Sequence, residues 1–142
     1  MRTNLTADDV ADLLEEPLVA VLATRRPDDT ILLSPVWFEW RDGGFNVWAS
    51  PSDKGKIRHI ERDPRVSIVV ANSDWPYKGI EVRGEARLSR DADEFYGVLG
   101  RTARRYFGEA MGAGFAESFT QPGVVLRIEP GALRAWDYSD EA

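Results

Sequence analysis

The sequence contains no cysteine and only one histidine among its 142 residues. Without thiols, zinc–thiolate sites, iron–sulfur clusters and cysteine nucleophiles are excluded, and one imidazole cannot build a histidine-rich metal site. We therefore expect no bound metal. Long apolar runs are also absent: LVAVLA at 18–23 is typical, whereas a membrane-spanning helix needs about 20 apolar residues. The sequence thus predicts no contact with a membrane.

Charge and length narrow the class of protein further. The formal net charge of −6 repels a phosphate backbone, so we expect no nucleic-acid partner. The segment MRTNLTADDV at 1–10 has no apolar core of the secretory type, which favours the cytoplasm. No repeat or linker composition interrupts the chain, and a chain of this length buries a sufficient core without cross-links. We predict a single domain over residues 1–142.

The pattern of apolar residues and turn residues predicts a mainly β (α+β) fold. We expect helices before Pro17, from Ser52 or Asp53 to Arg62, and over 91–107, with a weaker helical segment at 114–120. The expected strands are 18–24, 31–40, 45–50, 66–71, 80–88, 124–129 and 132–136. This order lacks βαβ periodicity and therefore predicts a six- to seven-stranded antiparallel barrel with peripheral helices.

Two of the predicted strands carry additional information. Strand 31–40 has large apolar side chains on both faces, so a helix, a ligand or another chain must cover the face outside the barrel. Strand 80–88 alternates strictly between apolar and charged residues, with Gly84 on its buried side. A glycine there predicts a bend or a close backbone approach.

A basic cluster lies at the start of the second predicted helix. Lys54 and Lys56 occupy its first turn, where the helix dipole is already positive, so a bound anion such as a phosphate would relieve the repulsion. The alternative is that both side chains point into water. Four aromatic residues, Trp37, Trp48, Trp75 and Tyr77, are expected to converge near this turn, although each by itself is also compatible with the core. Together they favour a phosphorylated planar heterocycle as ligand.

Three stretches carry a family resemblance. They read LVAVLATRRPDDTILLSPVWFEW, WASPSDKGKIRHIERDPRVSIVV and WPYKGIEVRGEARL, and the run from Lys56 to Val70 is the most specific. They resemble the pyridoxamine 5′-phosphate oxidase-like split β-barrel proteins, which bind FMN or a deazaflavin. The resemblance implies a split barrel that forms a homodimer with two sites at the subunit interface.

The resemblance also implies roles for particular residues. Strand positions flank the cofactor ring, a strand end reaches the ribityl chain and phosphate, two lysines bind the phosphate, and one loop approaches from one of the subunits. The positions that flank the ring are Ser34, Pro35, Val36 and Trp37, and the strand end that reaches the ribityl chain and phosphate is Trp48, Ala49 and Ser50. The phosphate-binding lysines are Lys54 and Lys56, and the loop residues are Trp75 and Tyr77. Asp53 replaces an arginine that is common in flavin-binding members, and no counterpart of the substrate-phosphate arginines of true pyridoxamine phosphate oxidases is present.

The expected function is that of an oxidoreductase. The resemblance is closest to the branch of deazaflavin (coenzyme F420)-dependent reductases, which implies hydride transfer between the deazaflavin and a small unsaturated organic substrate. The alternatives are an FMN-binding oxidoreductase on the same scaffold and a non-catalytic cofactor-binding protein. The cofactor would carry the chemistry, so we assign no catalytic residue, and we expect His59 to be an exposed spectator on the outer part of its helix.

Overall fold

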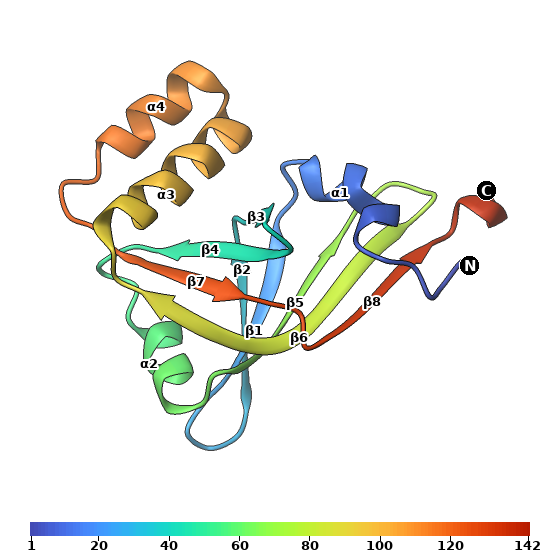
Figure 1. Ribbon diagram of the computed structural model, residues 1–142, viewed down its shortest axis with the longest axis horizontal. Helices are drawn as coiled ribbons and strands as arrows, with labels where there is room; N and C mark the ends of the chain where they lie inside the picture. Colours follow the sequence, from blue (N-terminus) through green and yellow to red (C-terminus); the bar gives the residue numbers. More distant parts are fainter.

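The computed structural model describes all residues from 1 to 142 and contains eight strands, four α-helices and two short 3-10 turns (Figure 1). The helices are α1 (Ala11–Glu15), α2 (Gly55–Arg62), α3 (Ala92–Phe107) and α4 (Glu109–Glu117). The strands are β1 (Ala20–Arg25), β2 (Ile31–Val36), β3 (Glu39–Arg41), β4 (Gly44–Ala49), β5 (Arg65–Ala71), β6 (Lys78–Ser89), β7 (Val124–Ile128) and β8 (Ala132–Asp137). The 3-10 turns are Asp8–Val10 and Ser139–Glu141.

All eight strands pair antiparallel in one curled sheet, which confirms the predicted fold class. The order is β2-β1-β5-β6-β7-β4-β3, and β8 pairs with β6 outside this path. Strand β6 joins the two halves of the sheet: its residues 78–83 pair with β8, and its residues 86–89 pair with β7. Gly84 lies between these stretches, where a Cβ atom would stand 2.4 Å from the carbonyl oxygen of Glu129. The predicted close backbone approach at Gly84 is therefore confirmed.

The main core fills the concave side of the sheet. Its cluster of 22 buried apolar residues includes Leu22, Phe45 and Ile68. Ile57 and Ile60 of α2 belong to the same cluster, so the predicted inner face of that helix is confirmed. A second, four-residue cluster joins α3 to β7 through Phe95, Val98, Leu99 and Val125. Helix α3 is thus anchored on the barrel by the apolar stripe that its sequence predicts.

The predicted strand 31–40 is divided in two, which makes eight strands in place of seven. Strand β2 ends at Val36 and β3 begins at Glu39. The backbone groups of Phe38, between them, bond to side chains of α3: its N–H donates to the Tyr106 hydroxyl at 3.2 Å, and its carbonyl accepts from the Arg105 guanidinium. The prediction of one continuous strand is wrong because these helix side chains satisfy the backbone that a sheet ladder would otherwise need.

The outer face of β2 is uncovered within a single chain. Ile31 is 44% exposed and Leu33 is 64% exposed, whereas Val36 and Phe38 are buried. The expectation that a second element covers this face is met only at one end: Trp37, which continues the face beyond β2, packs against Tyr106 and Phe107 of α3, whereas no helix of the same chain covers Ile31 and Leu33.

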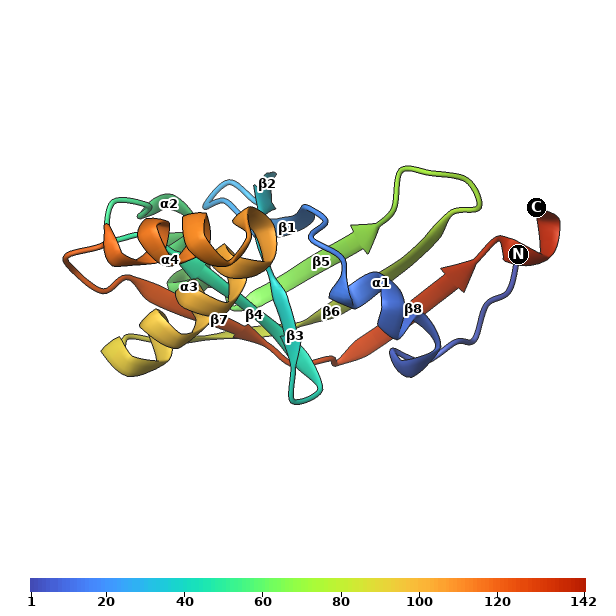
Figure 2. The same cartoon turned by 90° about the horizontal axis from the view of Figure 1, so that it is seen from above.

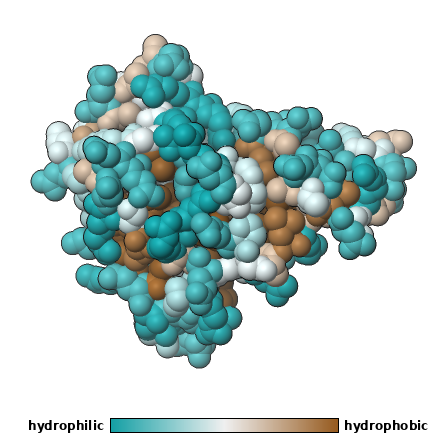
Figure 3. Space-filling model, viewed as in Figure 1, coloured by the Kyte–Doolittle hydropathy of each residue, from teal (hydrophilic) through white to brown (hydrophobic).

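The functional elements gather at one end of an elongated molecule (Figures 1 and 2). Helices α2, α3 and α4 lie at one end, and both termini lie at the other end with the β5–β6 loop. On the face shown in Figure 3, hydrophilic residues dominate the outer surface, and apolar residues are visible chiefly in recesses between the elements. None of the helices combines the length and apolar character that a membrane crossing requires.

Candidate functional site

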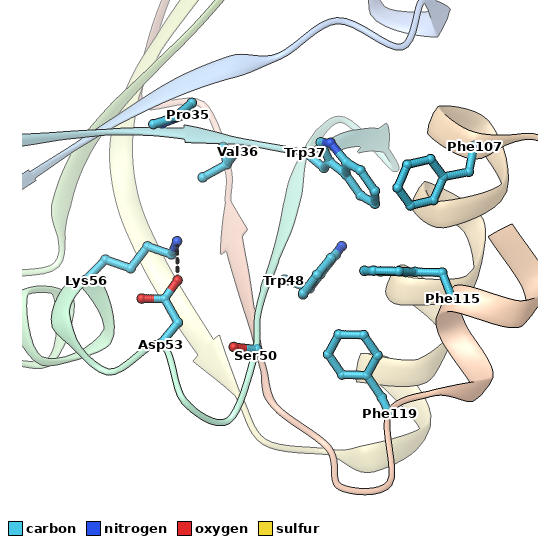
Figure 4. A pocket seen from close by; sticks show the side chains of 10 residues that line it. All are labelled: Pro35, Val36, Trp37, Trp48, Ser50, Asp53, Lys56, Phe107, Phe115 and Phe119. Atoms are coloured by element: carbon cyan, nitrogen blue, oxygen red, sulfur yellow. Dashed lines mark ion pairs between the residues drawn. The ribbon is translucent and has the colours of Figure 1, made fainter. Parts of the chain in front are cut away.

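A cavity of about 480 Å³ opens between the ends of β2 and β4, the start of α2 and the α3–α4 hairpin (Figure 4). This volume lies within the range of about 300 to 1,000 Å³ that small-molecule sites occupy. The ten lining residues are Pro35, Val36, Trp37, Trp48, Ser50, Asp53, Lys56, Phe107, Phe115 and Phe119. The polar side chains lie on one side of the cavity and the aromatic side chains on the other.

The polar end contains one ion pair at the start of α2. The Lys56 Nζ lies 2.6 Å from the Asp53 carboxylate, and the Lys56 side chain is 11% exposed. The Ser50 hydroxyl lies nearby on the cavity wall and is 3.0 Å from the Ser52 hydroxyl. No side chain caps the first turn of α2, so its free N–H groups add to the positive potential there. Lys56, Ser50 and this helix start therefore fit a phosphate, for which Asp53 is the competing anion.

The aromatic end is built from two tryptophans and the α3–α4 hairpin. Trp37 is stacked on Tyr106 with ring centroids 4.6 Å apart and an angle of 5° between the planes. Phe107 meets the Trp37 ring edge-on at 4.9 Å. Trp48 lies 6.1 Å from both Trp37 and Phe115. These packed rings form a rigid wall suited to a flat ligand.

Hydrogen bonds fix the rings of this wall. The Trp48 indole N–H donates to the Thr102 hydroxyl at 3.0 Å, and that hydroxyl donates in turn to the Val98 carbonyl at 2.8 Å. The Tyr106 hydroxyl accepts from the Phe38 N–H and donates to the Leu18 carbonyl. The side-chain polar atoms of Trp48 and Tyr106 are therefore already bonded within the protein.

A partly buried polar network holds α3 against strands β3 and β4. The Arg101 guanidinium donates two hydrogen bonds to the Glu39 carboxylate, at 2.8 and 2.9 Å, and the Asn46 amide donates a third at 3.0 Å. Arg127 donates to the Asn46 amide oxygen at 3.3 Å. Burial raises the pKa of Glu39, but the hydrogen bonds from Arg101 and Asn46 outweigh it, so the net pKa lies below its ordinary value. Glu39 is thus an anion that positions α3.

Six of the eleven residues predicted from the sequence line this one cavity. They are Pro35, Val36, Trp37, Trp48, Ser50 and Lys56. Ser34 and Ala49 are their chain neighbours on β2 and β4 but do not line it. The structure separates the two lysines, because Lys54 lines an adjoining hollow with Arg58 and Arg90.

Trp75 and Tyr77 lie elsewhere. Their rings pack against each other at 5.3 Å and against Tyr138. The β5–β6 loop, which contains both residues, lies at the end of the molecule that holds the chain termini, opposite α2 (Figures 1 and 2). The convergence of all four aromatic residues on the cationic turn is therefore not found within one chain. His59 is also placed differently from the prediction: it is half-buried, and its Nδ1 lies 3.1 Å from the hydroxyl of the buried Thr24.

The sequence analysis missed the contribution of the helical hairpin. Phe107, Phe115 and Phe119 line the cavity, and half of the six phenylalanines of the chain lie between 107 and 119. The enrichment of phenylalanine in this short segment, which has little helical periodicity, was the sequence feature that could have indicated these cavity residues. Their convergence depends on the tight contact of α4 with α3 at Gly112, where a Cβ atom would stand 2.5 Å from the Arg104 Cα.

The fold and the cavity define an α+β half-barrel protein with one aromatic-walled pocket that carries an ion pair at its polar end. A family model described as pyridoxamine 5′-phosphate oxidase matches residues 6–137. The chain therefore belongs to the pyridoxamine 5′-phosphate oxidase family. None of the curated proteins matches it.

Several solved structures share this fold. A conserved hypothetical protein from Mycobacterium tuberculosis is 23% identical with a TM-score of 0.81, over 96% of this chain and 88% of that one. An F420 reductase is 30% identical with a TM-score of 0.66, over 86% of this chain and 93% of that one. A FAD-binding protein from Mesorhizobium loti is 20% identical with a TM-score of 0.63, over 94% and 93%. Together with the family match, the F420 reductase supports an oxidoreductase of the flavin or deazaflavin type, whereas the other two structures show the fold.

Proposed function

We propose that the cavity binds a deazaflavin, coenzyme F420, and that the protein transfers a hydride between it and a small unsaturated organic substrate. The observation that carries this proposal is the position of Lys56, whose ammonium group lies at the polar end of a cavity walled by Trp37 and Trp48. The 30% identity to an F420 reductase favours the deazaflavin over FMN, which is the alternative cofactor. A non-catalytic cofactor-binding protein is the other alternative.

The protein would contribute binding and orientation. Lys56 and Ser50 would hold the phosphate by charge-assisted hydrogen bonds, and Pro35, Val36 and Trp37 would flank the ring. When bound, the reduced deazaflavin supplies the hydride. The chain's own rings would keep the ligand planes aligned, and orientation of this kind is worth several kcal/mol of a reaction barrier. Lys54, in the adjoining hollow, stays a predicted second phosphate ligand.

We further propose that the protein acts as a homodimer with its sites at the subunit interface. The uncovered apolar face of β2, with Ile31 and Leu33 exposed, supports a second copy of the chain as its cover. Trp75 and Tyr77 are too far from the cavity of their own chain to contact a ligand there. In the proposed dimer, their predicted role as site residues would be at the cavity of the partner subunit.

Direct titration tests the proposed cofactor. Coenzyme F420 and FMN are each added to the protein, and binding is followed through quenching of tryptophan fluorescence, for which Trp37 and Trp48 serve as reporters in the wall. We expect Lys56→Ala to weaken binding about tenfold or more, because a hydrogen bond to a charged group contributes about 1.5 to 3 kcal/mol. Arg87→Ala removes the same charge from an exposed position on β6, outside both the cavity and the hollow of Lys54, and serves as the control.

The outcomes separate the three functions. Tighter binding of coenzyme F420 than of FMN supports the deazaflavin, and the reverse order supports the FMN alternative. Binding without hydride transfer to any substrate leaves the non-catalytic alternative. If neither cofactor binds more tightly than about 1 mM, or if Arg87→Ala weakens binding as much as Lys56→Ala, the proposal is wrong.

A further inference from the structure

The two ends of the cavity differ in what they offer a ligand. The charged lining residues, Asp53 and Lys56, both lie at the polar end, whereas the far end is lined by Trp37, Trp48 and the three hairpin phenylalanines (Figure 4). Phe107 is 40% exposed, so the aromatic end also opens toward solvent. A second molecule therefore has access to this end from the side of the α3–α4 hairpin.

No charged side chain lines the aromatic end. Arg101, on the same helix as Phe107, is bonded to Glu39, and the terminal nitrogens of Arg105 donate to the carbonyls of Leu14 and Phe38. Neither arginine lines the cavity. An ionised group that entered this end would lose its hydration without gaining a partner, which is a large cost.

The rings also disfavour a cation. One face of Trp37 is covered by the parallel Tyr106 ring, and Phe107 approaches Trp37 edge-on. The Trp48 ring meets Phe119 edge-on at 5.5 Å and Phe95 edge-on at 6.3 Å. A cation at this end would lose hydration and find no carboxylate, because Asp53, the only acidic lining residue, is paired with Lys56 at the polar end. A flat uncharged ring loses little hydration and can be added to this wall through stacked or edge-to-face contacts.

We propose that the aromatic end is the substrate-selecting part of the site and that it admits uncharged, planar, conjugated ring compounds while rejecting their anionic and cationic analogues. That these ring compounds are substrates, and not only ligands, rests on the proposed function. Phe115 and Phe119 are the specificity-determining residues, because they line the cavity, are less exposed than Phe107, and pack against Trp48 with ring centroids 6.1 and 5.5 Å away.

A matched set of ligands tests this selectivity. Naphthamide, naphthoate and naphthylmethylammonium share one ring system and differ in charge, and their binding is measured by isothermal titration calorimetry. We expect naphthamide to bind at least tenfold more tightly than either ion. Phe115→Ala weakens naphthamide binding about tenfold, the upper end of what one aromatic contact contributes, and Phe115→Leu, which keeps most of the volume, weakens it less.

Met111→Ala is the matched control. Met111 lies on the same helix, is 65% exposed and does not line the cavity, so its removal leaves naphthamide binding unchanged. Equal binding of the amide and either ion, no binding of the amide at all, or an equal effect of Met111→Ala and Phe115→Ala would each overturn the inference. A folded Phe119→Ala variant repeats the test if Phe115→Ala does not fold.

The same titrations distinguish this inference from the proposed function. Lys56→Ala is expected to weaken cofactor binding and to leave naphthamide binding intact, since Lys56 lies at the polar end with Asp53 and not among the rings that hold naphthamide. Cofactor binding without any preference for the neutral ring refutes only the substrate class. A preference for the neutral ring without cofactor binding refutes the proposed function and leaves a selective pocket for neutral rings.

Discussion

The ion pair between Glu39 and Arg101 offers a quantitative test of how the helical hairpin is held over the cavity. Glu39 is buried and accepts three hydrogen bonds, two from Arg101 and one from Asn46. In Glu39→Gln the shape is retained, but one amide N–H₂ group faces the donors of Arg101 or Asn46. Breaking a fully buried pair costs about 3 to 5 kcal/mol, whereas the Arg101 side chain is 41% exposed. Water compensates part of the loss, so we expect about 2 kcal/mol.

Thermal unfolding followed by circular dichroism measures this loss. At roughly 3 °C per kcal/mol for a domain of this size, the melting temperature of Glu39→Gln should fall by about 6 °C at pH 7. Arg90→Met is the control, because it removes a partner from the exposed pair of Arg90 with Glu61, whose atoms are 3.7 Å apart. An exposed pair contributes about 0 to 1 kcal/mol, so this variant should melt within about 2 °C of the parent protein.

The pH dependence of the same variant gives a second, independent check. The pKa of Glu39 in the folded protein lies below its ordinary value of 4.5, so the unfolded chain binds the proton more tightly. The stabilisation by Glu39 is therefore complete above pH 4.5 and is lost as the pH falls through the folded-state pKa. Other carboxylates contribute equally to both proteins, and the stability difference between parent and Glu39→Gln should shrink on acidification below pH 4.5. A difference that is below 1 °C at pH 7, or that stays constant into acid, would refute the role of the pair.

Three further predictions concern the sheet, the subunit interface and the polar end of the cavity. Gly84→Ala should lower the free energy of unfolding in urea by about 1 to 3 kcal/mol, since its Cβ would overlap a backbone carbonyl, while Gly55→Ala, with open space around it, should not. Leu33→Glu should convert a dimer into a monomer in sedimentation velocity, and an unchanged mass would show that β2 is not the interface. Asp53→Asn should tighten phosphate-dependent cofactor binding by about threefold to tenfold, because it frees the Lys56 ammonium; weaker binding in the titration would contradict the role of Asp53 as a competing anion.

Local periodicity was sufficient to predict the helices and strands that bury one face. Strand β6 alternates as predicted, with Ile80 and Val82 buried and Arg83 exposed, and α3 buries Phe95 and Leu99 as its stripe requires. These patterns depend only on neighbours along the chain. The separation of Lys54 from Lys56 depends on where α2 begins, and sequence patterns fix a helix start only to within a few residues. Because Lys54 is the N-cap residue and Lys56 lies inside the first turn, the two side chains reach different hollows.

The division of strand 31–40 shows why the rest of the site could not be predicted from the sequence. The apolar pattern of this segment continues through Trp37 and Phe38, and nothing local signals a break. The break exists because Tyr106 and Arg105, some 70 residues away, bond to the backbone of Phe38. The same contact brings Tyr106 under Trp37 and Phe107 to the cavity mouth. One long-range interaction therefore both ends the strand and builds the aromatic wall, so a local rule is broken at the place where the cavity forms.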